Sequence, residues 1–474
     1  MVRVVVVGGG ISGLAAALAL SRDAPPGTRV TVVDGASRVG GKLRVSPVGG
    51  VLVDEGAETF LARAPEGVEL VGAVGLGADL VHPVTTDAAV VIDGEPRRLP
   101  ARTVFGVPGD RAALRRAGVL SEEGLAAVGA DKPEPAPLGD PSVGEYVGRR
   151  LGREVVERLV DPLLGGVYAG RADGLSLRAT VPALAAALDA RGGRLVAAAK
   201  AVVDSAPPNG GGGGPAFASV DGGLGLLPEA VARASGADVR LRSPIRRIAR
   251  TPGGFRLVGG PVPDPVTLTA DAVVVAVPAS KAAGLLEDLA PWAAHELAAV
   301  EYASVGIVTL AYPAAVAAGL RGSGLLVPGA EGRAVKAVTY SSAKWRHLAP
   351  RRGREVAIVR ASVGRHGEAR VLQREDPDLL RLVAGQVAAL TGIRGAPVAG
   401  RVTRWGGALP QYAPGHLERV RRIRADVARV PGLAVCGAAF DGVGVPACVR
   451  SGYAAAAQVV AYLRDWGGGR EAGA

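Results

Sequence analysis

The stretch that decides the fold reads VRVVVVGGGISGLAAALAL and occupies residues 2–20. Its first six residues are an almost continuous β-branched run, typical of a strand buried on both faces of a parallel sheet. Glycines with the spacing of a tight turn follow, and an alanine- and leucine-rich run then predicts a helix from residue 14. A second predicted strand, at 30–33, ends on Asp34. Strand, glycine turn, helix and terminal acid in this order predict a Rossmann-like unit that binds a dinucleotide.

The glycine turn and the start of the helix form the first half of a cofactor cradle. Gly8 permits the tight turn, Gly10 lets the backbone approach a pyrophosphate, and Gly13 allows the helix to pack closely on the strand. We expect the pyrophosphate on the exposed N–H groups where the helix begins, and the ribose hydroxyls on the Asp34 carboxylate. The contacts predicted here are Gly8, Gly9, Gly10, Ile11, Ser12, Gly13 and Asp34.

The residues after the acid favour a flavin over a nicotinamide cofactor. Residues 35–44 read GASRVGGKLR, in which an arginine, a glycine pair and further basic residues suit a second pass of backbone along a longer pyrophosphate and an isoalloxazine ring. A glycine-rich surface turn is the alternative. Residues 50–60, GVLVDEGAETF, then predict a strand and a turn close to the flavin ring. The contacts predicted in these two segments are Gly35, Arg38, Gly41, Lys42, Gly56, Ala57, Glu58 and Thr59.

The C-terminal part of the chain completes the same predicted domain. Residues 432–446, GLAVCGAAFDGVGVP, combine a strand, a glycine-rich turn and an acid, and 448–463 predict an alanine-rich helix. Such a strand delivers an acid near the ribityl chain of a flavin, and the helix N-terminus stabilises charge on the reduced ring by about 0.5–2 kcal/mol. An ordinary βα connection is the alternative. The contacts predicted here are Gly437, Asp441, Val443, Gly444 and Val445.

Composition limits the class of protein. With 48% apolar residues the chain can bury a large core, and no apolar run approaches the ~18 residues of a membrane span. Two cysteines exclude a disulfide framework. The net charge of +11 is spread along the chain without aromatic–basic motifs, which disfavours nucleic acid as a partner. We therefore expect a cytoplasmic protein whose contact with a membrane is at most peripheral.

The pattern along the chain predicts an α/β fold with a discontinuous FAD-binding Rossmann-like domain, a mixed-sheet substrate domain and a helical insertion. Residues 217–232 are expected to form a loop that leads into a helix, and Ile245 is expected to contact the adenine side through its backbone. The predicted boundaries are 1–75, 216–290 and 405–474 for the FAD domain, 76–106 and 291–404 for the substrate domain, 107–204 for the helical domain, and 205–215 for a flexible Gly/Pro-rich loop.

Several blocks are more specific than a general flavoprotein pattern. They include GGGISGLAAA (8–17), DGASRVGGKLR (34–44), LVDPLLGGVYAGRADGLSLRATVPAL (159–184), RWGGALPQYAPGH (404–416) and CGAAFDGVGVPACVRSG (436–452). Together they closely resemble the porphyrinogen oxidases of the bacterial HemY type, and the resemblance covers essentially the whole chain. It implies a non-covalent FAD enzyme of haem biosynthesis that oxidises a porphyrinogen with O2 and releases H2O2. It also implies a flavin contact at Trp405, and a downstream ferrochelatase as a partner.

The resemblance and the composition point to coproporphyrinogen III as the substrate. Only six of the 55 basic residues are lysines, a bias typical of GC-rich actinobacterial genomes, and Gram-positive members of this family prefer that substrate over protoporphyrinogen IX. Four propionates need cations around the mouth of the site, and arginine suits carboxylates. Six electrons leave the substrate in three two-electron flavin cycles.

No acid–base or metal-ligating set emerges from the sequence, so the catalytic residues are unknown and no metal is expected. The five histidines lack metal-ligand spacing, and a packed or surface position is the favoured interpretation. Lys344 is weighed as a lysine that holds a water against flavin N5, with a solvated side chain favoured. We interpret Cys436 as a core residue at a strand end and Cys448 as a residue at a helix start.

Other functions on the same scaffold remain open at this point. They are a protoporphyrinogen IX oxidase, an amine oxidase or carotenoid desaturase, and a flavin-free prenyl-binding chaperone. The flavin contacts predicted at both ends of the chain argue against the chaperone.

Overall fold

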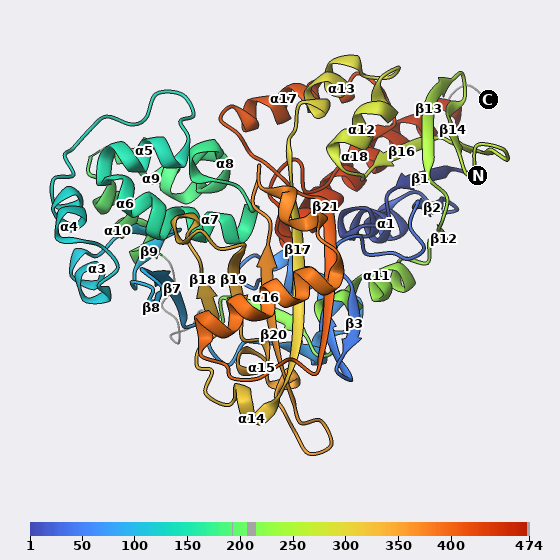
Figure 1. Ribbon diagram of the computed structural model, residues 1–474. Helices are drawn as coiled ribbons and strands as arrows, with labels where there is room; N and C mark the ends of the chain where they lie inside the picture. Colours follow the sequence, from blue (N-terminus) through green and yellow to red (C-terminus); the bar gives the residue numbers. More distant parts are fainter. Residues whose placement is uncertain (192, 206–214, 472–474) are drawn as a thin grey trace.

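The computed structural model describes residues 1–191, 193–205 and 215–471. Figure 1 shows a cluster of helices on one side, a long-stranded sheet in the centre, and a second sheet with its helices on the other side, where the N-terminus lies. The predicted loop at 205–215 falls almost entirely on residues 206–214, which lie outside the described residues.

The predicted βαβ unit is present and forms the middle of a five-stranded parallel sheet. The strand order is β12-β2-β1-β16-β22, and all four pairings are parallel. The strands are β1 (Arg3–Val7), β2 (Arg29–Val33), β12 (Asp238–Arg240), β16 (Ala272–Val275) and β22 (Leu433–Val435). Three distant parts of the chain, two of them near its ends, therefore share one sheet.

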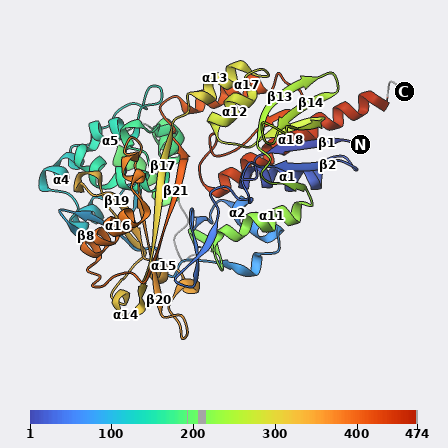
Figure 2. The same cartoon turned by 45° about the vertical axis from the view of Figure 1, so that its right-hand side comes forward.

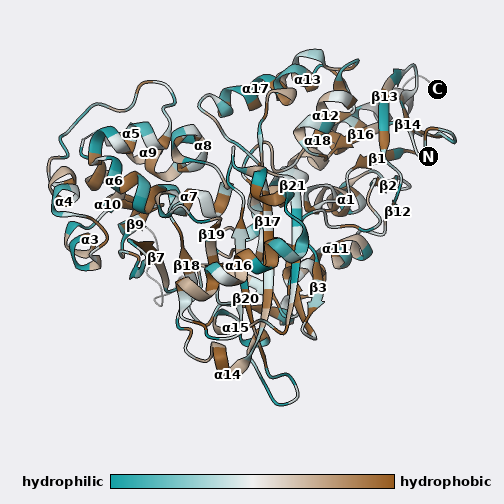
Figure 3. Cartoon of the chain, in the orientation of Figure 1, coloured by the Kyte–Doolittle hydropathy of each residue, from teal (hydrophilic) through white to brown (hydrophobic). Residues whose placement is uncertain are grey.

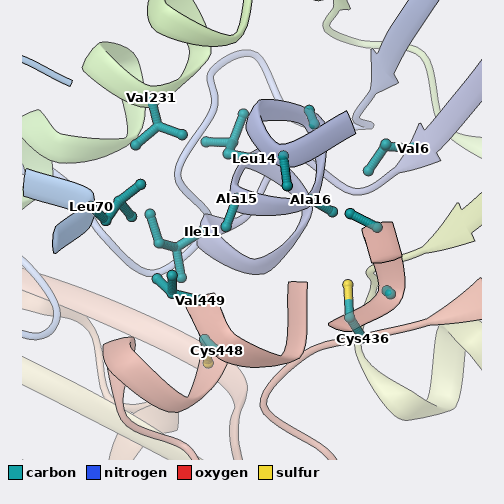
Figure 4. Packing of buried hydrophobic residues seen from close by; sticks show 14 of the residues in the cluster. Val6, Ile11, Leu14, Ala15, Ala16, Leu70, Val231, Cys436, Cys448 and Val449 are labelled. Carbon is teal, nitrogen blue, oxygen red and sulfur yellow. The ribbon is translucent and has the colours of Figure 1, made fainter. Parts of the chain in front are cut away.

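Helices α1 (Ile11–Asp23), α11 (Leu227–Ser235) and α18 (Val445–Glu471) pack together beside this sheet. Their buried side chains combine leucine, isoleucine and valine with several alanines, among them Ala15 and Ala16 (Figure 4). A Cβ at position 452 would lie 2.2 Å from the backbone oxygen of Ser12. Glycine at that position therefore allows α18 to contact α1 closely, beside the start of the cofactor cradle.

The central sheet has seven strands in the order β21-β17-β20-β19-β18-β7-β8, and only the β18–β7 pairing is parallel. Figure 2 shows the two longest strands, β17 and β21, side by side. The strands are β7 (Ala88–Ile92), β8 (Glu95–Arg98), β17 (Tyr302–Pro313), β18 (Gly324–Leu326), β19 (Val335–Thr339), β20 (Val356–Val363) and β21 (Ala399–Pro410). β21 continues through the predicted domain boundary at 404/405.

Helix α16 (Asp376–Thr391) covers one face of the central sheet. Its buried residues recur at helical spacing, as with Val383 and Val387, and its colours in Figure 3 are mixed, as expected of an amphipathic helix. Along β17, Val308 and Leu310 join this core. The alternating positions Val305 and Ile307 point to the opposite face, where the cavity described below lies.

The described residues between 111 and 205 are mostly helical, as predicted, and supply most of a core cluster that Val90, Ile92 and Tyr412 also join. The two helices between 106 and 143 are short, with seven and eight residues, as the proline- and glycine-rich sequence there suggests. The helices are α3 (Arg111–Ala117), α4 (Glu122–Gly129), α5 (Val143–Leu151), α6 (Arg153–Val155), α7 (Asp161–Tyr168), α8 (Leu177–Thr180), α9 (Pro182–Arg191) and α10 (Leu195–Ser205).

One local prediction was wrong. The first residues of the expected loop at 217–232 form strand β11 (Phe217–Val220), because β5 (Phe60–Leu61) and β6 (Leu80–Val81) pair with it from either side.

The remaining strands are β3 (Val45–Val48), β4 (Val51–Asp54), β9 (Thr103–Val104), β10 (Val107–Pro108), β13 (Ile245–Thr251), β14 (Gly254–Gly259) and β15 (Val266–Ala270). The remaining α-helices are α2 (Pro65–Ala73), α12 (Ala279–Leu286), α13 (Pro291–Ala298), α14 (Ala314–Ala317), α15 (Ser341–Lys344) and α17 (His416–Val427).

Within the described ranges, no helix combines the length and the apolar character that crossing a bilayer requires.

Candidate active site

A cavity of about 410 Å³ lies where the glycine turns of the parallel sheet meet the central sheet. One wall consists of backbone-rich segments on either side of α1 and before α18. The other wall consists of side chains from β17, β19, β20 and β21. The predicted residues that line it are Gly8, Gly10, Ile11, Ser12, Asp34, Gly41, Lys42, Gly56, Ala57, Trp405, Gly437, Val443 and Val445.

The first glycine turn has the geometry that its sequence predicts. Gly8 has a φ of 119°, and a Cβ there would lie 2.5 Å from the Ala276 carbonyl oxygen. A Cβ at Gly13 would lie 2.0 Å from the Gly8 oxygen, which explains the close packing of helix on strand. At Gly10 no atom lies within 4 Å of the Cβ position. The backbone of Gly10 is therefore open to a ligand, as pyrophosphate binding requires.

The second glycine turn is tied to the first. The Gly40 N–H donates to the Gly9 carbonyl oxygen at 2.7 Å. The Arg38 guanidinium donates to three backbone carbonyls of its own segment, among them Gly41 at 2.9 Å. Arg38 thus shapes the turn and does not line the cavity. Lys42 does line it, and burial lowers the pKa of its ammonium group.

Glu58 lies behind the cavity wall in a buried ionic cluster. Its carboxylate accepts from Lys344 Nζ at 2.7 Å and from Trp345 Nε1 at 3.2 Å, and it pairs with Arg360. Burial alone would raise the pKa of Glu58, but the adjacent ammonium and guanidinium groups hold it well below its usual range. Arg360 also donates to the Gly56 carbonyl at 2.6 Å, so the cluster holds the GAET turn against the cavity.

This cluster corrects the interpretation of Lys344. Its side chain is 14% exposed and pairs with Glu58, so it is neither solvated nor part of the cavity lining. The lysine that reaches the cavity from the central sheet is Lys336 on β19.

Lys336 is a site residue that the sequence reasoning missed. It is 7% exposed, and its ammonium contacts the Gly165 carbonyl oxygen at 3.3 Å. Burial, together with the nearby Arg365 guanidinium, lowers the pKa of Lys336 to about 7. The sequence contained one sign of this residue's role, which is a single charged residue inside the otherwise uncharged strand pattern AVKAVTY. Other lining residues missed from the sequence include Tyr302, Val305, Ile307 and Ser362.

The C-terminal turn lines the cavity and leads directly into α18, which begins at Val445. The Asp441 carboxylate, expected near a ribityl chain, pairs with Arg424, with Nη1–Oδ1 at 2.9 Å, and does not line the cavity. Tyr412 steadies this turn, because its hydroxyl donates to the Ala438 carbonyl at 2.6 Å and accepts from the Gly442 N–H at 2.9 Å.

The other predicted contacts support the cradle from outside the lining. A Cβ at Gly9 would lie 3.2 Å from Asp34 Oδ2, and one at Gly35 would lie 3.2 Å from the Pro244 Cβ. Thr59 donates to the Ala218 carbonyl at 3.0 Å. The predicted residues absent from the lining are Gly9, Gly13, Gly35, Arg38, Glu58, Thr59, Ile245, Asp441 and Gly444. Their contact with a cofactor stays a prediction.

Two of the sequence blocks that carry the family resemblance, 159–184 through its residues 165–170 and 404–416, contact each other beside the cavity. Gln411 Nε2 donates to the Tyr168 carbonyl at 2.8 Å, and the rings of Tyr168 and Tyr412 lie 5.6 Å apart. His416 stacks on Tyr412 at 3.8 Å, so this histidine is packed, as expected. Val167 from the first block lines the cavity. The two blocks therefore pack against each other and together form part of the cavity lining.

Both cysteines are buried and free. Cys436 directly follows β22, and Cys448 lies in the first turn of α18 and lines the cavity. Burial raises the pKa of both thiols, which keeps them protonated. In the part of the chain that the structure describes, no three His, Cys, Asp or Glu residues gather as metal ligands.

The glycine turns and the cavity are those of a class of flavoproteins, which a comparison with known families identifies. Residues 11–460 match the flavin-containing amine oxidoreductases, and the chain belongs to this family. The cavity fits the FAD of such enzymes, because Gly10 and Gly437 leave backbone open toward it and the starts of α1 and α18 both line it.

Individual relatives indicate which members of the family this chain resembles most in sequence and structure. The chain is 38% identical to a coproporphyrinogen III oxidase of Mycobacterium tuberculosis, with 97% of each chain covered. It is 32% identical to the coproporphyrinogen III oxidase of Bacillus subtilis, with 97% of this chain and 98% of the relative covered. A crystal structure from Exiguobacterium sp. 255-15, provisionally named a protoporphyrinogen oxidase, has a TM-score of 0.85 at 30% identity and covers 97% of this chain and 99% of that one.

Proposed function

We propose that the protein oxidises coproporphyrinogen III to coproporphyrin III with O2, releasing H2O2. The observation that carries this is the cavity itself. It joins a dinucleotide cradle to an apolar wall that contains one buried lysine, in a chain whose full-length relatives carry that name. Bound FAD supplies the acceptor for two electrons in each oxidation step. We further propose that the FAD is non-covalent, since the Cys448 thiol is protonated.

The chain's own part in the reaction is to position the substrate and to accept a proton. Three two-electron oxidations remove one hydrogen from each of the four bridging carbons and two protons from pyrrole N–H groups, so each step releases one proton beside the hydride that the flavin accepts. Lys336 Nζ lines the cavity, and its lowered pKa leaves a large fraction of neutral amine near pH 7. We assign this amine the role of proton acceptor. Val305 and Ile307 add apolar surface to the same lining.

The choice of coproporphyrinogen over protoporphyrinogen rests on the named relatives. Cations were expected around the mouth of the site, with arginine favoured, but the described lining contains lysines only, Lys42 and Lys336. Lys336 is buried and serves as the neutral proton acceptor, so the half-buried Lys42 is the cation of this lining that attracts propionates. Delivery of the product to a ferrochelatase and peripheral contact with a membrane stay predictions.

Turnover of three substrates by the holoprotein tests the proposal: coproporphyrinogen III, protoporphyrinogen IX and a polyamine. We expect the tetracarboxylate to be oxidised best and its KM to rise more steeply with ionic strength than that of the dicarboxylate. Equal salt dependence combined with equal or better turnover of protoporphyrinogen would favour a protoporphyrinogen oxidase. Preferential oxidation of the polyamine would favour an amine oxidase, which the family also includes by name.

A further inference from the structure

A second cleft, of about 960 Å³, lies outside the flavin cavity and shares none of its lining residues. Its walls come from the tip of the β3–β4 hairpin, the segment after β6, the turn after β11 and the segment 346–354. β3 and α15 mark this part of the molecule in Figure 1. The volume lies near the upper end of the ~300–1,000 Å³ range of small-molecule sites.

The cleft concentrates positive charge that the protein leaves unpaired. Arg346, Arg351 and Arg354 line it, and among the described residues no carboxylate lies within 4.0 Å of their guanidinium nitrogens. Arg360 behind the flavin cavity, in contrast, is paired with Glu58. Asp221 supplies the only carboxylate in the described lining, so cations exceed anions there.

Two of the basic side chains are held in place and keep an unused polar atom. Arg354 donates to the carbonyl oxygens of His347 at 2.8 Å and Ala349 at 2.7 Å, while its buried Nε has no partner in the described structure. The buried Nδ1 of His347 likewise has no partner there. The two carbonyl contacts fix the Arg354 guanidinium against the segment 347–349, so its positive charge stays at the cleft wall.

The lining also contains four aliphatic residues, two of which are exposed. Leu52 is 47% exposed and Val84 is 64% exposed, although both are large hydrophobic residues, and Val81 and Leu348 complete this surface. The cleft thus has cations in one part and aliphatic side chains in another. This combination suits a ligand that carries carboxylates on an apolar body. An inorganic anion would leave the aliphatic part uncovered. A flat bilayer surface would not reach the half-buried His347 and Arg354.

We propose that this cleft is a second site for a carboxylate-bearing tetrapyrrole, distinct from the flavin cavity. The proposal rests on the proposed function, since the substrate and the product of that reaction are the polycarboxylates with an apolar ring that the protein meets. The site holds the oxidised product at the surface after it has left the flavin cavity. Arg346 and Arg351 contact its propionates, and Leu52 and Val84 contact its ring.

The test is equilibrium binding of coproporphyrin III to the FAD-loaded protein, followed by quenching of the porphyrin fluorescence. The variant Arg346→Gln/Arg351→Gln removes two cleft cations whose side chains make no hydrogen bond within the described structure. The matched control, Arg352→Gln/Arg370→Gln, removes the same charge at residues that do not line the cleft. We expect at least a tenfold weaker Kd in the cleft variant, equal to about 1.4 kcal/mol, and less than a twofold change in the control.

Turnover separates this inference from the proposed function. We expect kcat and KM for coproporphyrinogen III to be unchanged in the cleft variant, because the flavin cavity keeps its lining. If the wild-type protein fails to oxidise coproporphyrinogen, the proposed function fails, whatever the binding result. If turnover is normal but both variants bind coproporphyrin III like wild type, or weaken it equally, only the second site is refuted.

Two further measurements test whether the cleft binds a different ligand, either a small anion or a membrane surface. Citrate carries carboxylates without an apolar body, and we expect it to displace coproporphyrin III only at concentrations at least a hundredfold higher. Equal potency of citrate would overturn the role of the apolar surface. Loss of binding to phosphatidylglycerol vesicles in the cleft variant, with coproporphyrin binding intact, would show a membrane contact and overturn the proposal.

Discussion

Replacement of Lys336 by methionine tests the central assignment of the active site. Methionine has a similar length and no charge, and the contact it loses is the 3.3 Å contact to the Gly165 carbonyl. If Lys336 accepts the pyrrole proton, kcat should fall by about a hundredfold to ten-thousandfold, which is the usual contribution of a general base. The acid limb of the pH–rate profile, which wild type should show near the pKa of about 7, should disappear with it.

The same substitution should stabilise the fold, and its magnitude follows from the pKa. The gap between the ordinary value of 10.5 and about 7 corresponds to roughly 5 kcal/mol, because each pKa unit is worth 1.36 kcal/mol. The folded pKa is the lower one, so the unfolded chain binds more protons between these two values. Wild-type stability therefore rises with pH across this window, and the cost of Lys336 is fully present below about pH 7. The advantage of the variant should be largest there and should vanish as pH approaches 10.5.

Chemical denaturation across pH measures the stability change, and steady-state oxidation of coproporphyrinogen III measures the rate. Lys344→Met is the matched control, since that lysine pairs with Glu58 outside the cavity lining. The control should lose stability and keep the acid limb. A Lys336→Met protein with the wild-type kcat and an unchanged acid limb would refute the role of this lysine.

Three further predictions concern the cradle and its support. Gly10→Val should fold normally, because no atom lies within 4 Å of the new Cβ, yet retain no FAD after reconstitution; full flavin absorbance in the variant would contradict the pyrophosphate role. Asp34→Ala should weaken FAD binding by about 1–3 kcal/mol in a titration of the apoprotein, and unchanged affinity would remove Asp34 from the ribose site. Glu58→Gln should cost about 3–5 kcal/mol in urea unfolding at pH 7, because Lys344 and Arg360 stay buried without their carboxylate. Since the pKa of Glu58 lies below its ordinary 4.5, that deficit should shrink as pH falls below this value; a deficit independent of pH would contradict the ionic account.

The parts of the fold that were predictable are those whose signal is local. The β-branched run of β1 and the glycine turn after it specify their structure within a few residues, and the helices between 107 and 203 follow from local composition. β11 was missed because its partners lie in β5 and β6, far away in the sequence. A strand of four residues carries little signal until those partners are placed.

The candidate site divides in the same way. Backbone contacts of the cradle require glycine, and glycine is visible in a sequence. The cluster around Glu58 joins residues that are 286 and 302 positions away, so no spacing rule reveals it. Lys336 became recognisable only when β19 was placed opposite the glycine turns. The sequence patterns contained information on local backbone geometry. They contained none on the pairing of side chains that are distant in the sequence.

The order of strands in the parallel sheet also has a consequence for synthesis in the cell. Ribosomes add about 5–20 residues per second, so β1 and β2 emerge many seconds before β22 and α18 are made. Val443 and Val445 belong to the cavity wall, and no cradle exists until they have left the ribosome. Flavin is therefore loaded after translation of this region, and a product truncated before residue 433 lacks one edge strand and the helix that closes the site. Yellow colour in a preparation thus reports that the chain was made through to α18.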